Sequence, residues 1–478
     1  MSDQPQTVND LGRVHIVGIG GSGMSGLAQL LLDRGVAVSG SDIRDSDRIE
    51  ALRSQGASIH IGHDAGRLVT TAGPVQTVVD TPDIPDDNPE ILAARQQRIP
   101  VISRSQALAI VMSDHEVIGI AGTHGKTTTS SMLTIALQRC GLDPSYAIGS
   151  EVYDLGGNAH IGTGDLFVVE ADESDGAFLL MDPRAVVVTN VEADHLNHWG
   201  EYDNLLAAFD DYVDLVAANQ GFAVIYGDET DSANLAERAK GRQLDVVTYG
   251  QNSGVDYRLE VSDHQAGYYS FDVIHAKHRL GTVTLSVPGY HNALNATAAL
   301  TVCHRLNLPL DEAILGLRSF TGTRRRLELK GEVTGIRVFD DYAHHPTEVV
   351  ATLSAAREFA GAGRVVVAFQ PYRYYRTELF AEEFGQALGL ADDVVVMEVF
   401  DPGDKPVSGA SGQVVANHVR SESTGVIFES SWDAVAGHIA DRTRSGDIVL
   451  TVGAEEMAML GPEVLAELQR REAEGAIP

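Results

Sequence analysis

A lysine and a threonine at the start of a predicted helix are the side chains best placed to bind phosphate. They lie in GTHGKTTT, residues 122–129, between an apolar run at 117–120 that predicts a strand and a helix ending near Gly141. Glycines let the backbone approach an anion, and the helix N-terminus offers unpaired N–H groups and a positive dipole end. We expect Lys126 to reach the β- and γ-phosphates of a nucleotide and the Thr127 hydroxyl to bind Mg²⁺.

This loop is a shortened form of the usual phosphate-loop pattern, because Ile120 stands where that pattern has a glycine. The prediction therefore depends on the strand–turn–helix context as much as on the letters. The alternative is a turn rich in glycine and threonine that carries a surface lysine. The predicted nucleotide-binding loop consists of Gly122, Thr123, His124, Gly125, Lys126, Thr127 and Thr128.

Two side chains that are able to bind a cation follow predicted strands further along the chain. The apolar run 166–169 ends at Glu170. A carboxylate at such a strand end completes the Mg²⁺ shell beside bound phosphates, because this hard cation prefers oxygen ligands. The run 185–190 leads to Asp194 and His195, and His195 is a candidate ligand of a second cation. A lone histidine in a loop is otherwise structural or exposed.

An earlier glycine motif indicates a second nucleotide-like ligand. Gly18, Gly20 and Gly23 form GxGxxG between a predicted strand at 14–17 and a helix, and Asp42 follows at the distance where a dinucleotide fold places its ribose-binding acid. Alone, this pattern suggests a nicotinamide-dependent oxidoreductase. Together with the phosphate loop, it suggests a ligand that is held by its diphosphate.

The segment PGYHNALNA, residues 288–296, predicts a turn that enters a helix. His291 and Asn295 are four residues apart and therefore share one helical face. Amides such as Asn292 and Asn295 are able to contact an adenine edge there, and helix capping is the alternative. The run Arg324 to Arg326 is expected to neutralise phosphate at a domain boundary, although charge runs are usually solvated.

The last third of the chain repeats the pattern of a strand followed by a polar segment. The predicted strand 336–339 ends in DDYAHHPTE at 340–348, and the strand 364–369 is followed by Arg373 and Arg376. Open α/β sheets bind their ligands at the carboxyl ends of strands. We predict that the two arginines face a carboxylate or a phosphate, with an ordinary surface as the alternative.

Together these elements predict an α/β protein, because short apolar strands alternate with helices as in a parallel sheet. At 478 residues the chain is long enough for about three domains. We place them at 1–114, 115–327 and 328–478, with Rossmann-like first and third domains and a phosphate-loop ATP-binding domain between them. Additional strands are predicted at 36–38, 77–79, 99–102, 393–397 and 447–451, and a loop at 81–89.

Composition narrows the function classes. The chain has 35 basic and 67 acidic side chains and a net charge of −32, so its surface repels nucleic acid and anionic membranes. Cys140 and Cys303 are too few for a disulfide framework and suit a reducing compartment. The polar N-terminus and the lack of a run of about 18 apolar residues predict a soluble cytoplasmic protein.

In order and spacing, these motifs resemble those of the Mur ligase family of peptidoglycan synthesis. The matching segments are HIVGIGGSGMSGLA (15–28), GTHGKTTT (122–129), EADESD (170–175), NVEADHL (190–196), PGYHNALNA (288–296), RR (325–326), DDYAHHPTE (340–348) and YRYYRT (372–377). They span nearly the whole chain. The GIGGSGM opening is similar to the family members that add L-alanine, rather than to recycling members that add a murein tripeptide.

The resemblance implies an ATP-dependent ligase. ATP would phosphorylate the muramyl carboxylate of UDP-N-acetylmuramate, and the amine of L-alanine would attack the acyl phosphate to form an amide. Lys126 would neutralise charge on the γ-phosphoryl group. Thr127 and Glu170 would hold one Mg²⁺, while Glu170 and His195 would hold a second.

The resemblance also implies the remaining contacts. His344, Arg373 and Arg376 would face the acyl phosphate and the amino-acid carboxylate, so that the site forms only on domain closure. The implied ATP contacts outside the loop are His291, Asn292, Asn295, Arg326 and Asp341. The implied UDP-sugar contacts are Gly18, Gly20, Gly21, Ser22, Gly23, Met24 and Asp42. We expect a monomer or a weak homodimer.

Some positions depart from the family pattern. Asp80 to Asp83 replaces a small serine-rich loop, and its negative charge is predicted to weaken diphosphate binding unless it points away. Tyr372, Asn197 and Glu455-Glu456 replace a histidine, an aspartate and a Gly-Asp pair, which affects affinity or amino-acid choice. The acidic substitutions around Asp83 motivate one further hypothesis, a nucleotide-binding regulator without catalysis.

Overall fold

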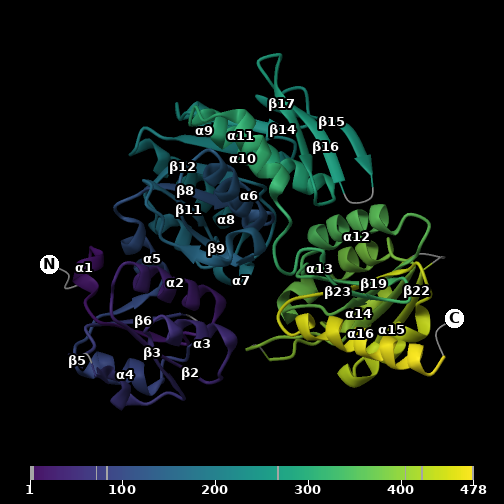
Figure 1. Ribbon diagram of the computed structural model, residues 1–478, viewed down its shortest axis with the longest axis horizontal. Helices are drawn as coiled ribbons and strands as arrows, with labels where there is room; N and C mark the ends of the chain where they lie inside the picture. The colour runs from purple at the N-terminus through teal and green to yellow at the C-terminus, as the bar shows by residue number, and fades with distance from the viewer. Residues whose placement is uncertain are drawn as a thin grey trace. The chain divides into compact units, whose positions relative to one another are not determined.

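The computed structural model describes residues 5–71, 73–81, 84–265, 268–403, 405–420 and 424–475 (Figure 1). The chain divides into two compact units, each described here by itself. The first unit contains residues 1–259, 273–281 and 295–317, and the second contains residues 260–272, 282–294 and 318–478. Helices alternate with mainly parallel strands, and the described residues form three large sheets, so the predicted α/β class is confirmed.

The first sheet has the strand order β3-β2-β1-β6-β7, and its neighbouring strands are parallel. Its elements are α1 (Val8–Leu11), β1 (Val14–Val17), α2 (Ser22–Asp33), β2 (Val38–Asp42), α3 (Asp47–Ser54), β3 (Ser58–Ile61), η1 (Ala65–Leu68), β4 (Val69–Thr70), β5 (Gly73–Pro74), β6 (Thr77–Asp80), α4 (Pro89–Gln96), β7 (Val101–Ser103) and α5 (Arg104–Met112). The strand order reverses between β1 and β6. The glycine loop that follows β1 therefore lies at the kind of switch point where open α/β sheets bind ligands.

Strand β2 differs from its prediction. The sequence predicts a strand at 36–38 and a polar end at 39–42, whereas β2 runs from Val38 to Asp42. Ser39 and Ser41 are buried inside the sheet because both hydroxyls have partners: Ser39 Oγ lies 3.0 Å from His15 Nδ1, and Ser41 donates to the buried Glu90. A buried hydroxyl is tolerated when it is hydrogen-bonded. The polar residues 39–42 therefore belong to strand β2.

The second sheet has the order β10-β9-β11-β8-β12-β13-β14-β15-β16-β17. Its strands are β8 (Glu116–Ala121), β9 (Ser145–Val152), β10 (Gly157–His160), β11 (Leu166–Glu170), β12 (Pro183–Val188), β13 (Phe222–Tyr226), β14 (Val246–Gly250), β15 (Tyr257–Gln265), β16 (Tyr268–His275) and β17 (His278–Leu285). The predicted strands at 117–120, 166–169 and 185–190 are confirmed. β8 lies between β11 and β12 and is parallel to both, so the loop after β8 and the acid that ends β11 meet at one edge.

The helices and turns that accompany this sheet begin with the phosphate-loop helix. They are α6 (Lys126–Arg139), η2 (Tyr153–Leu155), η3 (Ala177–Leu180), α7 (Leu196–Trp199), α8 (Tyr202–Asp214), η4 (Leu215–Ala217), α9 (Thr230–Gly241), α10 (Tyr290–Arg305) and α11 (Leu310–Ser319). The predicted helix after the loop is confirmed, because α6 begins at Lys126 and ends two residues before Gly141.

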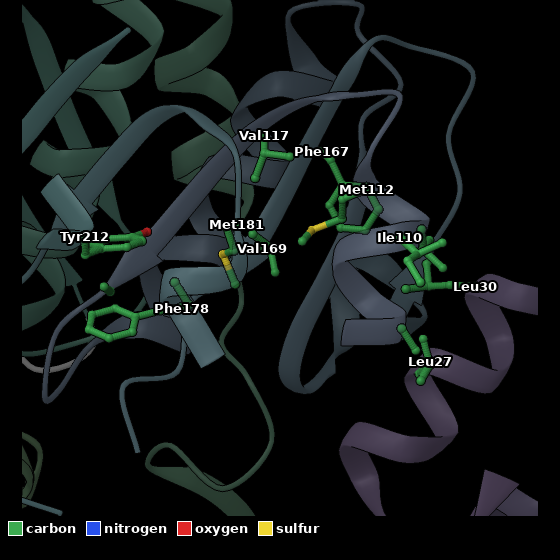
Figure 2. Packing of buried hydrophobic residues seen from close by; sticks show 14 of the residues in the cluster. Leu27, Leu30, Ile110, Met112, Val117, Phe167, Val169, Phe178, Met181 and Tyr212 are labelled. Atoms are coloured by element: carbon green, nitrogen blue, oxygen red, sulfur yellow. The ribbon is translucent and has the colours of Figure 1, made fainter. Parts of the chain in front are cut away.

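One apolar cluster extends from α2 and α5 into the second sheet (Figure 2). Leu27 and Leu30 on α2 and Ile110 on α5 are buried in the same cluster as Val117 and Phe167 of the central strands. The α2 residues recur with helical spacing, which puts one apolar face against the core. This cluster fixes the glycine loop of the first sheet relative to the edge where β8 and β11 end.

The third sheet has the order β18-β19-β23-β20-β21-β22, in which only β18 and β19 are an antiparallel pair among the described residues. Its elements are β18 (Glu328–Val333), β19 (Ile336–Asp341), α12 (Pro346–Ala360), β20 (Val365–Phe369), α13 (Tyr374–Leu388), β21 (Asp393–Met397), α14 (Gly412–His418), β22 (Gly425–Glu429), α15 (Trp432–Arg442), β23 (Ile448–Val452) and α16 (Met457–Ala473). Alternate strand residues pack against opposite layers: α12, α13 and α14 cover one face, and α15 and α16 cover the other.

The described residues contain no helix that is both long enough and apolar enough to cross a membrane. The predicted boundaries near residues 114 and 327 fall between the sheets, where β7 ends before β8 and β17 ends before β18. They stay predictions. Pro82 and Asp83 of the acidic loop lie outside the described residues.

Candidate active site

The phosphate loop connects β8 to α6, and two of its glycines cannot be replaced without a clash. Gly122 and Gly125 have φ of +128° and +82°, a backbone conformation that residues with a side chain rarely adopt. A Cβ on Gly122 would lie 2.1 Å from Thr189 Oγ1, and a Cβ on Gly125 would lie 2.7 Å from Asn295 Oδ1. The loop backbone is therefore held against its neighbours in a turn that opens at the N-terminus of α6. Such a terminus has N–H groups available for an anion.

Lys126 is held inside the loop by a carboxylate that the sequence analysis did not single out. Its Nζ donates to Gly122 O at 2.7 Å and to the two oxygens of Glu173 at 2.8 and 3.1 Å. Burial alone would lower the pKa of Lys126, but the negative charges of Glu173, Asp172 and Glu170 outweigh burial and raise that pKa well above its usual value. Lys126 is therefore a permanent cation.

Thr127 and Glu170 meet as predicted. Thr127 Oγ1 donates to Glu170 Oε2 at 2.9 Å, and Gly149 N donates to the same oxygen at 2.7 Å. Burial raises the pKa of Glu170, although Lys126 and these hydrogen bonds oppose it. A hydroxyl and a carboxylate side by side at the phosphate loop are the hard oxygen donors that Mg²⁺ prefers. The residues therefore fit a magnesium ion.

His195 precedes α7 in a left-handed conformation with φ of 54°. The backbone N–H of His195 donates to Asp194 Oδ1 at 2.8 Å, and the imidazole Nε2 of His195 lies 3.7 Å from Asp194 Oδ2. Burial would raise the pKa of Asp172, but Lys126 and His195 lower it, so His195 lies within electrostatic range of the acids that follow β11. The predicted pairing of His195 with Glu170 at a second cation stays a prediction.

Asp42 forms a hydrogen bond with the glycine loop that follows β1. Asp42 Oδ2 accepts from Gly20 N at 2.9 Å, and Oδ1 accepts from Arg44 N at 3.1 Å. With one backbone donor on each oxygen, this carboxylate braces the loop and keeps further acceptor capacity on both oxygens. The Met24 side chain is 3 % exposed and packs in the core, so only its backbone N–H, with those of Ser22 and Gly23, is available to a ligand.

The three candidates on α10 differ in their surroundings. Burial and the charge of Arg326 lower the pKa of His291 to about 4, so this imidazole is neutral at neutral pH. Asn292 Nδ2 donates to Pro288 O at 2.7 Å, which supports the alternative that this amide caps the helix. Asn295 is buried with its oxygen against Gly125, beside the phosphate loop.

Two arginines of the run 324–326 are partly buried, whereas Arg324 is exposed. Arg325 Nε donates to Asp340 Oδ2 at 2.9 Å, and its guanidinium lies 4.8 Å from the ring centre of Tyr342. Tyr342 in turn donates to Glu455 Oε1 at 3.2 Å, so this departure from the family pattern has a local structural use. Arg326 Nη1 donates to Glu348 Oε1 at 3.3 Å. The arginines therefore hold together the polar segments of the second unit.

Asp341 and His344 lie at the carboxyl end of β19. Burial raises the pKa of Asp341 to about 6, although the charge of Arg326 and the backbone N–H groups of Leu327 and Ala343 oppose it. His344 N donates to Glu348 Oε2 at 2.9 Å, and its Nδ1 lies 2.9 Å from Tyr342 O. The ring of His344 is thereby fixed in orientation.

Arg373 and Arg376 surround an aromatic ring. Their guanidinium carbons lie 5.3 and 5.8 Å from the ring centre of Tyr372, and this ring also makes an edge contact with His344 at 5.7 Å. Arg376 is 1 % exposed, which contradicts the alternative of an ordinary surface for this residue. The structure thus brings His344, Arg373 and Arg376 together around Tyr372.

Three residues of this region were missed by the sequence analysis. Glu173 binds Lys126, Glu348 joins Arg326 to His344, and Arg104 lies against Gly23 of the glycine loop. Glu173 and Glu348 lie inside the motifs at 170–175 and 340–348, but the sequence assigned no role to either residue. No sequence pattern around Arg104 indicated a site.

The chain is similar to known proteins in both sequence and fold. The chain matches the models "Mur ligase family, catalytic domain" over residues 13–116, "Mur ligase middle domain" over 120–303 and "Mur ligase, glutamate ligase domain" over 325–455. The UDP-N-acetylmuramate–L-alanine ligase of Acidothermus cellulolyticus is 50 % identical over 98 % of this chain and 97 % of that protein. The protein with the same name from Mycolicibacterium smegmatis is 47 % identical over 98 % of this chain and 97 % of its own length.

Solved structures show the same likeness. The UDP-N-acetylmuramate-alanine ligase of Thermotoga maritima superimposes with a TM-score of 0.80 at 29 % identity, covering 96 % of this chain and 99 % of that one. A murein peptide ligase from Psychrobacter arcticus superimposes with a TM-score of 0.70 at 25 % identity, covering 96 % and 98 %. On the family models and these nearly full-length relatives, the chain belongs to the Mur ligase family.

Proposed function

We propose that this chain joins L-alanine to the muramyl carboxylate of UDP-N-acetylmuramate at the expense of ATP, in the synthesis of the peptidoglycan precursor. The observation that carries the proposal is the paired arrangement at the phosphate loop, with Lys126 on Glu173 and Thr127 on Glu170. The substrates follow from the names of the relatives that share about half of the sequence over nearly the full length.

The residues at this loop divide the chemistry between them. Lys126 neutralises the charge that develops on the transferred γ-phosphoryl group, and it is pre-organised for this because its raised pKa keeps it charged. Thr127 and Glu170 hold one Mg²⁺, and Glu170 with His195 holds a second. When bound, these ions shield the phosphate oxygens and polarise the reacting group.

The remaining site residues bind and orient the substrates. The backbone of residues 18–24 holds the UDP diphosphate, with Asp42 bracing that loop through Gly20. His291 and Asn295 contact adenine, and Asn292 shapes the start of α10. The neutral state of His291 suits an aromatic base better than an imidazolium would.

The third domain supplies the acceptor side of the reaction. Arg326 and Asp341 position this domain on the nucleotide, while His344, Arg373 and Arg376 face the acyl phosphate and the carboxylate of L-alanine. An arginine offers planar paired donors that match a carboxylate. We retain domains at 1–114, 115–327 and 328–478, and a monomer or weak homodimer, as parts of this proposal.

Release of phosphate tests the proposal. The purified chain is incubated with Mg²⁺-ATP and UDP-N-acetylmuramate, and L-alanine or murein tripeptide is added in parallel. Release that requires both the nucleotide sugar and L-alanine is expected. Release with the tripeptide alone would assign the recycling reaction instead, and nucleotide-sugar binding without turnover would favour a regulator. Glycine and L-serine serve as competitor amino acids, because one methyl group discriminates by only about 1–3 kcal/mol.

The number of magnesium ions is testable separately. Mn²⁺ replaces Mg²⁺, and bound ions are counted by electron paramagnetic resonance in the presence of a non-hydrolysable ATP analogue and the nucleotide sugar. Two ions are expected in the wild type and one in His195→Asn. A single ion in both proteins would remove His195 from the metal site.

A further inference from the structure

Glu90 is a buried carboxylate beside the first sheet that the proposed mechanism does not use. It is the second residue of α4, and Asn88 caps this helix by accepting from the Glu90 N–H at 2.9 Å (Figure 1). The Glu90 side chain is 0 % exposed. Burial would raise the pKa of Glu90, but its contacts with His15 and Ser41 outweigh burial and lower that pKa. The interior of this domain therefore holds an ionised carboxylate, which is costly unless its partners compensate.

Both oxygens of this carboxylate are hydrogen-bond acceptors. Oε1 accepts from Asp64 N at 3.1 Å, and Oε2 accepts from Ser41 Oγ. His63 Nδ1 lies 3.3 Å from Oε2. Ser41 gives its only proton to Glu90, so in the 2.8 Å contact between Ser41 Oγ and His63 Nδ1 the imidazole is the donor. Glu90 thus joins the end of β2 to the segment that follows β3.

His15 on β1 supplies the positive charge that balances Glu90. Ser39 Oγ donates to Val14 O at 3.2 Å, so in its 3.0 Å contact with His15 Nδ1 the ring is the donor. In a neutral ring, His15 Nε2 would then turn a lone pair toward Glu90 Oε2, which lies 3.5 Å away. A proton on Nε2 converts this repulsion into an ion pair. The buried carboxylate is therefore compensated from β1 as well as from β2.

The serine that Glu90 holds is also the anchor of the glycine loop. Ser41 O accepts from Gly18 N at 2.8 Å and from Ile19 N at 3.1 Å. Asp42 holds the next residue of the loop through its carboxylate. The end of β2 therefore fixes the first turn of the glycine loop, and Glu90 fixes the end of β2.

A glutamine at position 90 would fit the space but not the hydrogen bonds. Its amide oxygen could accept from Asp64 N or from Ser41 Oγ, but its NH₂ group would then face the other donor. An unmatched pair of donors is unfavourable in a buried site. We expect Ser41 to move as a result, together with the carbonyl that holds the glycine loop.

We propose that Glu90 is a positioning residue for the nucleotide sugar: through Ser41, it keeps the glycine loop in the conformation that binds the diphosphate. This inference rests on the proposed function, because it assumes a nucleotide sugar at the backbone of residues 18–24. Glu90 touches no substrate in this scheme and transfers no proton. A loop that is already ordered avoids the entropy cost of ordering on binding, so the loss of Glu90 should weaken binding.

Binding and kinetics of the full chain test the proposal. Titration calorimetry without ATP is expected to show UDP-N-acetylmuramate bound at least about 10-fold more weakly by Glu90→Gln than by the wild type. In the phosphate-release assay, the KM for the nucleotide sugar should rise similarly, while kcat and the KM for ATP stay within about twofold. Unchanged affinity, or an equal rise of both KM values, would overturn the proposal.

A double-variant cycle tests whether Glu90 acts through Ser41. Ser41→Ala is expected to weaken binding of UDP-N-acetylmuramate by about 3-fold or more, because it removes the hydrogen bond to Glu90. Glu90→Gln combined with Ser41→Ala should then bind within about twofold of Glu90→Gln alone. Losses that simply multiply would mean two independent effects and would overturn the role of Ser41 as the link.

Leu11→Ala is the control for a general loss of stability. Leu11 is 0 % exposed and precedes β1 at the amino end of the sheet, where its carbonyl accepts from Thr77 Oγ1 at 2.8 Å. This variant should be less stable but should bind the nucleotide sugar within about twofold of the wild type. An affinity loss as large as that of Glu90→Gln would mean that destabilisation alone explains the effect, and the proposal would fall.

Hydrogen exchange reports on the loop itself, without any ligand. The amides of residues 18–20, followed by mass spectrometry in the free protein, are expected to exchange at least about 10-fold faster in Glu90→Gln than in the wild type. Unchanged exchange there would contradict the proposal, because it would mean that the end of β2 still holds the loop.

The failure of the proposed function gives a different result. If the wild type released no phosphate with L-alanine but bound UDP-N-acetylmuramate in a way that depended on Glu90, the ligase assignment would fail and the role of Glu90 would stand. If the wild type turned over normally and Glu90→Gln bound the nucleotide sugar equally well, the ligase assignment would stand and the role of Glu90 would be refuted.

Discussion

Replacing Lys126 by methionine is expected to destroy activity and also to destabilise the central domain. Lys126 Nζ binds both oxygens of Glu173, whose side chain is 1 % exposed, with Asp172 and Glu170 near the same ammonium. Methionine keeps the length but leaves Glu173 buried without a partner. Removing one member of a buried ion pair costs about 3–5 kcal/mol, so we expect the unfolding free energy to fall by about 3 kcal/mol or more. Turnover should fall at least about 100-fold.

The substitution Glu173→Gln distinguishes lost chemistry from lost stability. Alone, it removes the ionic partner of Lys126 but leaves the Gly122 carbonyl and the charges of Asp172 and Glu170, so we expect a smaller cost of about 1–2 kcal/mol. In the double variant, neither charge of the pair remains. We expect its unfolding free energy to return to within about 1 kcal/mol of the wild type, with turnover still absent.

Urea unfolding followed by tryptophan fluorescence measures these free energies. The chain has two tryptophans, and a Trp432→Phe background leaves Trp199 as the probe of the central domain. Trp199 Nε1 donates to the Glu173 carbonyl at 3.0 Å, so its signal reports on this region. The expected coupling energy is about 2 kcal/mol or more. Additivity of the two single substitutions within about 0.5 kcal/mol would refute a buried ion pair between these side chains.

Three further predictions concern buried polar groups. Tyr212→Phe is expected to raise the unfolding free energy by about 1 kcal/mol in the same Trp199 assay, because the buried Tyr212 hydroxyl has no hydrogen-bond partner among the described residues; destabilisation would mean that the hydroxyl is satisfied. In a Trp199→Phe background with Trp432 as probe, His291→Gln is expected to flatten the loss of stability on acidification. The pKa of His291 is about 4 when folded and about 6.5 when unfolded, so the wild type loses up to about 3 kcal/mol as the pH falls through that window, and parallel curves would contradict this. Asp341→Asn is expected to change the pH dependence of the unfolding free energy in the opposite direction. Burial raises the pKa of Asp341 to about 6, so the wild type gains stability as the pH falls from 7 to 4, and the variant should lack this gain. An unchanged slope would contradict the buried carboxylate.

Continuous apolar runs were sufficient to predict the strands that position the site. The runs at 117–120 and 166–169 became β8 and β11, and Glu170 lies at the end of its strand, in register with Ile120. A strand that is buried on both faces of a sheet is a nearly continuous run of apolar residues, so it is recognisable without knowledge of the strands beside it. The position of Thr127 beside Glu170 followed, because parallel strands end at the same edge of a sheet.

Residues whose role depends on distant contacts were not predictable. The sequence places acids at 170, 172, 173 and 175, and nothing in the letters shows which of them binds Lys126. That choice depends on how the chain turns after β11, which brings Glu173 to a lysine 47 positions earlier. Arg104 is a stronger case, because its surroundings consist of Gly23 on another helix and of the acids Glu170 and Asp172 from a different sheet.

The strands β15, β16 and β17 were missed for a different reason. β16 buries alternate residues only, so polar letters such as Ser270 and Asp272 interrupt the apolar pattern. A search for continuous apolar runs passes over this kind of half-buried strand. The same effect hid the end of β2, where Ser39 and Ser41 are buried with hydrogen-bond partners from other segments.

The charges around the phosphate loop bear on the two-ion proposal. Glu170, Asp172 and Glu173 carry three negative charges, against two positive charges on Lys126 and Arg104, which leaves 2 − 3 = −1. ATP adds about four negative charges and the muramyl carboxylate one more, so one divalent ion would leave the site at about −4 and two at about −2. In the proposed mechanism Lys126 is shared between Glu173 and the γ-phosphoryl group, so a second ion near His195 would further reduce the repulsion between the carboxylate and the γ-phosphate.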